Sequence, residues 1–180
     1  MAWLTQVRNA AGIEAVARLA ECIWRAHYTP IIGSDQVAYM LAHFQSPDAI
    51  AEQIAGGMHY HLLHYDGTPV GYCAWQVQTA CLFLSKLYVL DGFRGRGLAR
   101  RVLQAAVQAA HHHGLVRIAL TVNRHNTVAI AAYERMGFRI HRQVCADIGG
   151  GFVMDDHEME LLLVDRDQAP QSGAPQSGRR

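Results

Sequence analysis

The sequence predicts a mixed α/β domain of the α+β type, which we expect to occupy residues 1–165 of the 180-residue chain. Apolar residues in the first third recur at spacings of three and four, which is typical of amphipathic helices. Runs of aromatic and aliphatic residues follow from residue 58, and helical and strand patterns alternate beyond residue 98. Two successive copies of APQSG make up most of residues 166–180, so we expect a disordered tail there.

The first third is expected to hold one short strand and three helices. The elements are a strand at 3–7 and helices at 12–28, 34–44 and 47–55. Pro30 and Gly33 should end the first helix, because proline and glycine both interrupt helical hydrogen bonding. Either Ser34 or Asp35 can cap the second helix, and Ser46 can cap the third.

The remainder of the chain is expected to supply most of the sheet and two further helices. The elements are strands at 58–65, 70–78, 81–90, 116–122, 138–144 and 152–163, and helices at 98–113 and 126–137. Residues 66–69, DGTP, should form the turn of a hairpin between the first two of these strands. The strand at 81–90 is apolar at nearly every position, which is typical of the centre of a sheet.

The composition excludes several classes of protein. The net charge is +1 with histidine neutral, so no overall basic field is present to hold nucleic acid or an anionic membrane. No apolar run approaches the ~18 residues of a membrane span. We find no signal peptide in the first residues and no CxxC pair, and therefore expect a cytoplasmic protein whose four cysteines are buried thiols: Cys22, Cys73, Cys81 and Cys145.

Glycine and arginine are concentrated in residues 91–100, DGFRGRGLAR, directly before a predicted helix. A helix start leaves backbone N–H groups unpaired and carries the positive end of the helix dipole, so glycines there let an anion approach closely. The run matches neither GxGxxG nor GxxxxGK[ST], the two common phosphate-binding patterns. From these residues alone, a phosphate site and a surface turn with solvated arginines remain equally open.

The surrounding sequence favours the phosphate site. Residues 86–103, KLYVLDGFRGRGLARRVL, resemble the central motif of the GNAT acetyltransferases, and the signature positions are Arg94, Gly97 and Ala99. Residues 123–138 are similar to a second block of the same family, and its positions here are Asn126, Ala129, Tyr133, Gly137 and Phe138. The resemblance implies the GNAT fold: a central, mostly antiparallel sheet of six to seven strands, splayed between the fourth and fifth strands and flanked by about four helices.

The resemblance also implies acetyl-CoA as co-substrate, without a metal. Backbone amides of residues 94–99 would hold the pyrophosphate, and Arg135 would meet the ribose phosphate. The pantetheine arm would pair with the main chain of residues 87–89 as if it were an added strand. The residues implied in cofactor binding are Leu87, Tyr88, Val89, Arg94, Gly95, Arg96, Gly97, Leu98, Ala99, Arg100, Asn126, Ala129, Tyr133 and Arg135.

The implied reaction is direct attack of an amine on the thioester in a ternary complex. Tyr133 is the expected catalytic acid, which would protonate the departing thiolate. Many relatives carry a glutamate on the strand that leads into residues 87–89, but residues 81–86 contain no acid here. The absent acid favours a water relay or an amine that arrives partly neutral, and Asp155, Asp156 and the histidines of the last hairpin remain alternative bases.

The expected acceptor is a primary amine of a small molecule or a peptide. Candidates for its site are Trp24, Tyr28, Asp35 and Asp155, because aromatic rings and carboxylates attract a cationic amine. Trp24 lies at helical spacing and fits a core position better than a binding position. An exposed last strand often pairs in this family, so a homodimer is compatible with the resemblance.

Two alternatives to an acetyltransferase stay open. A non-catalytic acyl-CoA-binding or sensor domain of the same fold would fit the absent strand acid, although the intact Tyr133 argues against it. An RNA-associated protein would use the arginine loop, but near-zero net charge and the absence of interleaved basic and aromatic residues argue against that. The histidine runs at 59–64 and 111–113 are best explained structurally, because their spacing makes poor chelates.

Overall fold

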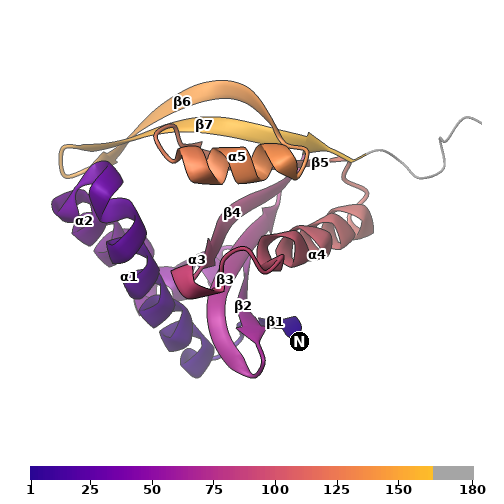
Figure 1. Cartoon of the computed structure of the whole chain (residues 1–180), viewed down its shortest axis with the longest axis horizontal. Helices are drawn as coiled ribbons and strands as arrows, with labels where there is room; N and C mark the ends of the chain where they lie inside the picture. The colour runs from indigo at the N-terminus through magenta and orange to yellow at the C-terminus, as the bar shows by residue number, and fades with distance from the viewer. Residues whose placement is uncertain (164–180) are drawn as a thin grey trace, which may run out of the picture.

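Seven strands form one sheet in the computed structural model, which describes residues 1–163. The strands are β1 Ala2–Gln6, β2 Met58–Tyr65, β3 Thr68–Val77, β4 Leu82–Val89, β5 Arg117–Asn123, β6 Arg139–Gly149 and β7 Phe152–Leu162. Their order across the sheet is β1-β2-β3-β4-β5-β7-β6, and all neighbours are antiparallel except β4 and β5 (Figure 1). The tail expected at 166–180 lies outside the described residues.

The parallel strands β4 and β5 separate soon after they meet. They pair only through Leu82 with Ile118 and Phe83 with Ala119. Beyond these residues β4 continues along β3, and β5 continues along β7. A gap therefore opens toward the C-terminal ends of both strands. This confirms the expected mostly antiparallel sheet with a splay between the fourth and fifth strands.

Helices cover both faces of the sheet. They are α1 Ala10–Ile32, α2 Ser34–Phe44, α3 Pro47–Ala55, the short 3-10 turn η1 Asp91–Phe93, α4 Leu98–His112 and α5 Thr127–Arg135. The helices α4 and α5 pack on one face around a core that includes Leu120 and Phe138. The helices α1 to α3 pack on the other face around Tyr60 and Tyr72. Figure 1 shows α1 and α2 on the side of the molecule opposite α4, with α5 beneath β6 and β7.

The end of α1 corrects one expectation. The helix continues through Pro30 to Ile32 rather than stopping before the proline. Proline in the last turn removes a single backbone donor, and the helix tolerates this loss near its end more readily than in its middle. The Gly33 N–H then donates to the Thr29 carbonyl at 3.0 Å and closes the helix.

Of the N-caps expected for the two following helices, one is confirmed and one is wrong. The N-cap of α2 is Gly33, at φ +86°, and neither Ser34 nor Asp35 caps it as expected. The two helices are joined by one residue, and only glycine adopts this φ readily. The expected cap of α3 is confirmed, because the Ser46 hydroxyl accepts from the Ala49 N–H at 3.2 Å.

Two strand boundaries also differ from expectation. The strand β6 extends to Gly149 rather than residue 144, because its ladder with β7 continues to the pair Gly149–Phe152. The first hairpin turn is tighter than the expected 66–69, because Thr68 already pairs with Tyr65. The turn itself is Asp66–Gly67, and both residues adopt the positive φ that tight hairpin turns require.

The four cysteines are all free thiols, but only two are buried. Cys73 and Cys81 are buried as expected, whereas Cys22 and Cys145 are exposed. Cys22 lies on the solvent side of α1, and Cys145 lies on β6 at the edge of the sheet. A strand at the edge of a sheet has a neighbour on one side only, so even its apolar side chains can remain exposed. The number and spacing of the cysteines do not reveal this exposure.

Gly71 on β3 makes room for the backbone of β4. A Cβ here would lie 2.3 Å from the Tyr88 carbonyl oxygen and 3.1 Å from the Val89 Cα. A paired strand cannot move aside without loss of its ladder, so Gly71→Ala is expected to lower the free energy of unfolding by at least about 2 kcal/mol. Urea unfolding measures this, with Gly92→Ala as control because an added Cβ there meets nothing within 4 Å. A loss below about 0.5 kcal/mol would contradict this packing.

Candidate active site

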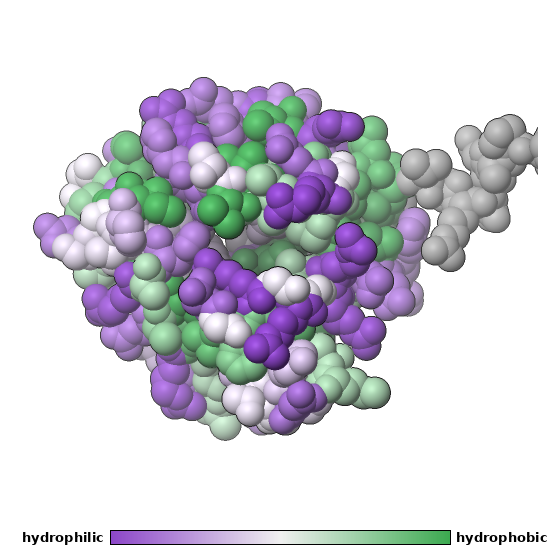
Figure 2. All heavy atoms as spheres, viewed as in Figure 1, coloured by the Kyte–Doolittle hydropathy of each residue, from purple (hydrophilic) through white to green (hydrophobic). Residues whose placement is uncertain are grey.

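A cavity of about 580 Å³ lies where β4 and β5 diverge. Its walls come from the end of α1, the second half of β4, the loop before α4, the end of β5 and one face of α5. Figure 2 shows the molecule hollowed at the centre of this face, with hydrophilic residues along the rim. In sheets with parallel strands, the carboxyl ends of diverging strands are a common place for a ligand. The cavity is therefore the candidate active site.

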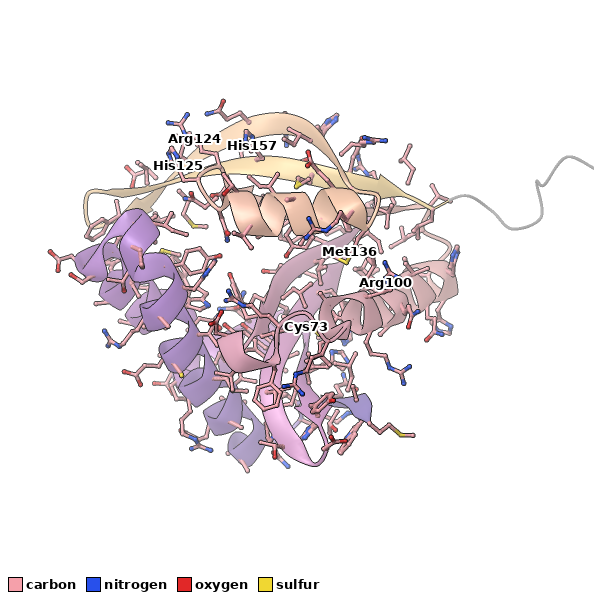
Figure 3. The ribbon with its side chains drawn as sticks, viewed as in Figure 1. Cys73, Arg100, Arg124, His125, Met136 and His157 are labelled. Carbon is pink, nitrogen blue, oxygen red and sulfur yellow. The ribbon has the colours of Figure 1, made fainter. Side chains whose placement is uncertain are left out.

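Most of the residues expected to bind a cofactor line this cavity. They are Leu87, Tyr88, Val89, Arg94, Gly95, Gly97, Leu98, Ala99, Arg100, Asn126, Ala129, Tyr133 and Arg135. Arg96 is the exception, since its guanidinium lies over the rings of Tyr65 and Phe93, at 5.2 and 5.3 Å. The Arg96 side chain therefore packs on these rings, whereas Arg94 and Arg100 line the cavity. Figure 3 shows Arg100 on α4 and Met136 at the end of α5 beside the opening.

The loop before α4 has the geometry of an anion site. Gly95 and Gly97 both have φ +75°, a backbone conformation that side chains with a Cβ rarely adopt. Gly97 is the N-cap of α4, no side chain caps this helix, and its first turn contains no acid. The first residues of this 15-residue helix line the cavity, so its uncapped amides and the positive end of its dipole lie at the cavity wall. The residues present fit a bound pyrophosphate.

One side chain near the loop is already paired. The guanidinium of Arg94 contacts the Asp91 carboxylate at 3.1 Å and donates to the Val89 carbonyl at 3.4 Å. It lies within reach of His27 on α1, and the pKa of His27 is lowered by burial and by this positive charge. His27 lines the cavity and is thus neutral at pH 7.

Tyr133 lies on the inner face of α5. The N-cap of this helix is Asn126, whose side chain accepts from the Ala129 N–H at 3.3 Å and stabilises the first turn of α5. The Tyr133 ring packs against Phe138 with centroids 5.6 Å apart. Burial raises the pKa of Tyr133, and the nearby Tyr28 raises it further. The phenol is therefore protonated at neutral pH.

Tyrosine rings form the wall opposite α5. Tyr28 and Tyr88 both line the cavity, with ring centroids 6.1 Å apart. Trp24 packs edge-on against both rings from behind and is only 4% exposed, so it is part of the core. Burial is the main reason that the pKa of Tyr28 is raised, and the carboxylate of Asp156 adds to this shift.

The other two acceptor candidates lie outside the cavity. Asp35 is exposed in the first turn of α2. Asp155 forms an ion pair with Arg124 at 2.9 Å and accepts from the Gln143 side chain at 3.0 Å. Figure 3 shows Arg124 beside β6 and β7, above the opening. The Asp155 carboxylate is thus paired with Arg124, and the Asp35 carboxylate lies outside the cavity on the surface of α2. Asp156, next to Asp155 in the chain, is buried.

Sequence reasoning missed two residues at the splay itself. Ser85 and Thr121 line the cavity from β4 and β5. Ser85 lies where the register between β3 and β4 shifts, so the strand departs there from simple alternation. Neither residue belongs to a motif, and their position depends on how the two strands diverge.

Within residues 1–163, no group of three or more His, Cys, Asp or Glu side chains is placed to hold a metal ion. Among the described helices, none combines the length and apolar character that crossing a membrane requires.

The model of the acetyltransferase (GNAT) family matches residues 17–138, which is more than half of the chain. The chain belongs to this family. The uncharacterized N-acetyltransferase YdgE of Bacillus subtilis is 35% identical over 68 residues, which are 35% of this chain and 43% of that protein. An uncharacterized N-acetyltransferase of Mycobacterium tuberculosis H37Rv is 35% identical over 101 residues, which are 56% of this chain and 62% of that protein. The chain thus matches less than two thirds of the length of these relatives.

Solved structures show the same fold. The PaiA N-acetyltransferase from Thermoplasma acidophilum, in complex with coenzyme A, superposes with a TM-score of 0.76 over 90% of this chain and 99% of that chain. Its sequence identity is 17%, so the likeness concerns the fold alone. The GNAT fold expected from the two motifs is therefore confirmed.

Proposed function

We propose that this GNAT protein transfers the acetyl group of acetyl-CoA to a primary amine of a small molecule or peptide, by direct attack in a ternary complex. One observation carries this proposal. A single cavity joins the glycine loop at the start of α4 to the half-buried Tyr133, along the open edge of β4. The names of both relatives include N-acetyltransferase, and the Thermoplasma protein was crystallised with coenzyme A, which supports the proposal.

Acetyl-CoA would enter with its phosphates at the glycine loop. Backbone amides of residues 95–99 would bind the pyrophosphate, and Arg94, Arg100 and Arg135 would add positive charge from the cavity wall. Arg96 would contribute only its backbone amide, because its side chain lies over Tyr65 and Phe93. The pantetheine arm would follow residues 87–89, where β4 has lost its pairing with β5.

Tyr133 would supply the proton for the leaving thiolate. Burial keeps this phenol neutral, so it carries a proton when the C–S bond breaks. A positioned donor in a site with little water transfers a proton far more readily than bulk solvent does. Tyr28, on the opposite wall, is the acceptor candidate that lines the same cavity.

A thiol-release assay tests the proposal. Acetyl-CoA is offered with a panel of polyamines, aminoglycosides, amino acids and short peptides, and free thiol is measured over the rate of hydrolysis. We expect turnover with one chemical class of amine and none with the others. Binding of acetyl-CoA, seen as protection against thermal unfolding, without turnover of any amine would instead indicate a non-catalytic acyl-CoA-binding domain.

A further inference from the structure

Four carboxylates lie within six positions of β7, and three of them have an arginine partner. The pairs are Asp155 with Arg124 at 2.9 Å, Glu158 with Arg142 at 2.8 Å and Glu160 with Arg117 at 3.1 Å. Asp156 is the fourth, and no cation lies within 4.0 Å of it in residues 1–163. The strand therefore neutralises each of its acids except one.

The unpaired acid is also the most deeply buried. Asp156 is 4% exposed, and its Oδ1 has no hydrogen-bond partner within the described part of the chain. A buried carboxylate without partners costs several kcal/mol of stability unless it binds something or takes up a proton. Such a residue is typical of a functional site, where stability is given up for chemistry.

Asp156 lies on the face of β7 that is turned toward α1 and α2. Strand alternation places it on the same face as Met154, which packs into the core formed with α1 and α2. Its partner across the ladder is Asn123 at the end of β5, two residues beyond Thr121 in the cavity wall. Asp156 thus lies at the C-terminal end of the splay.

Tyr28 connects Asp156 with Tyr133. The Asp156 carboxylate influences the Tyr28 phenol, and Tyr28 in turn influences the phenol of Tyr133. Both tyrosines line the cavity. Asp156 is not itself among the residues that line the cavity, but its carboxylate lies close enough to the Tyr28 phenol to influence it, and Tyr28 shares the cavity with the Tyr133 phenol.

We infer that Asp156 is the general base of the acetyl transfer, which receives the acceptor as an ammonium ion and takes its proton. This inference rests on the proposed function. It also assigns a substrate class: an amine that is positively charged in solution and enters a site lined by aromatic rings beside one negative charge.

The proton balance of the reaction closes with these two residues. The ammonium R–NH3⁺ gives one proton to the Asp156 carboxylate, and the neutral nitrogen then attacks the thioester carbonyl carbon and forms the C–N bond. The C–S bond breaks, its electron pair leaves with sulfur, and the thiolate takes the Tyr133 proton. The phenolate recovers a proton from the nitrogen of the new amide, and Asp156 releases its own to solvent. The products are the amide, CoA thiol and one proton.

The charge environment suits a base that works near neutral pH. Burial, and to a lesser extent the neighbouring Asp155, raise the pKa of Asp156 to about 6, and His157 opposes this shift. Tyr28 on α1 is the other ionisable group whose charge is coupled to Asp156, and Arg124 and Arg142 are bound to Asp155 and Glu158 instead. At pH 7 to 8 the carboxylate is ionised and can accept a proton. We expect kcat/KM to fall with an apparent pKa near 6 as the pH decreases.

Asp156→Asn and Asp155→Asn form a matched pair for the test. Each removes one charge from adjacent positions of β7, but only Asp156 lacks an arginine partner. With an amine that wild type acetylates, we expect Asp156→Asn to lower kcat about 10²- to 10⁴-fold and to abolish the acidic limb of the pH profile. Asp155→Asn should keep kcat within about threefold and keep that limb, moved to lower pH because the Asp155 charge raises the pKa of Asp156. Acetyl-CoA should protect both variants against thermal unfolding as it protects wild type.

Thermal unfolding without ligand provides a second readout. The pKa of Asp156 is higher in the folded protein than its ordinary value of 3.8, so protonation stabilises the folded state and this stabilisation is lost as the pH rises through about 6. Asparagine is neutral at every pH, so the Asp156→Asn variant does not lose stability as the pH rises. We expect the Tm of Asp156→Asn to exceed that of wild type by about 2 °C or more at pH 8, and the difference to shrink at pH 5.

The possible outcomes separate the two proposals. Turnover by Asp156→Asn within about threefold of wild type would overturn the assignment of the base and leave the acetyltransferase intact. A variant that is less stable than wild type at pH 8, or does not fold, would also overturn it, because a structural carboxylate would then be the explanation. If wild type acetylates no amine while acetyl-CoA still protects it, the proposed function fails, and the assignment fails with it.

Discussion

Tyr133→Phe is expected to lower kcat about 10²- to 10⁴-fold, the usual contribution of a positioned general acid. The substitution removes one oxygen from a half-buried ring and keeps its packing against Phe138. Because the phenol acts only when the C–S bond breaks, the loss should appear in kcat, and the Kd for acetyl-CoA should change less than about threefold. Steady-state thiol release and calorimetric titration with CoA measure the two quantities.

The control for this variant is Tyr65→Phe. Tyr65 lies at the end of β2 against Phe93 and Arg96, and it is not among the residues that line the cavity. Loss of its hydroxyl should leave both kcat and the Kd unchanged. If Tyr133→Phe also retained full turnover, Tyr133 would be a packing residue, and the thiolate would take its proton from solvent.

Alanine at both Gly95 and Gly97 is expected to weaken acetyl-CoA binding about 100-fold. Each glycine has φ +75°, and a residue with a Cβ resists this conformation by about 1–2 kcal/mol. The loop can relax when empty, but it must return to this conformation for its amides to meet the phosphates. The strain of the two residues together therefore opposes binding by about 2–4 kcal/mol. A value near the middle of this range, about 2.8 kcal/mol, corresponds to a 100-fold increase in Kd.

Gly92→Ala separates backbone conformation from the loss of glycine itself. Gly92 belongs to the same loop, is not among the glycines with positive φ, and has open space where a Cβ would be added. We expect its Kd for acetyl-CoA to stay within about threefold of wild type in the same calorimetric titration. Equal affinities for the double variant and Gly92→Ala would mean that the loop does not hold the phosphates.

Local patterns in the sequence were sufficient to predict the frame of the molecule. Helical and strand periodicities placed the elements in the order that the structure shows, and the paired motifs placed the splay between the fourth and fifth strands. The glycine positions of the loop were also predictable, because a positive φ before a helix selects glycine regardless of the remaining fold.

Features that depend on tertiary packing were not predictable from the sequence. Asp155 and Asp156 are adjacent and chemically identical, yet strand alternation directs one to Arg124 and buries the other. The direction of the Arg96 side chain depends on the rings of Tyr65 and Phe93, which come together only in the folded chain. Proline interrupts helices on average, but the last turn of α1 accommodates Pro30.

The most direct test of the CoA site is a titration of ¹⁵N-labelled protein with CoA, followed through the backbone amide resonances. CoA carries the phosphates and pantetheine but no acetyl group, so binding is observed without chemistry. We expect the largest shifts at residues 95–99, where the first α4 amides lie at the cavity wall, and a second group at residues 87–89 of β4. Saturating CoA that leaves both segments unshifted would contradict a coenzyme site at the splay of the sheet.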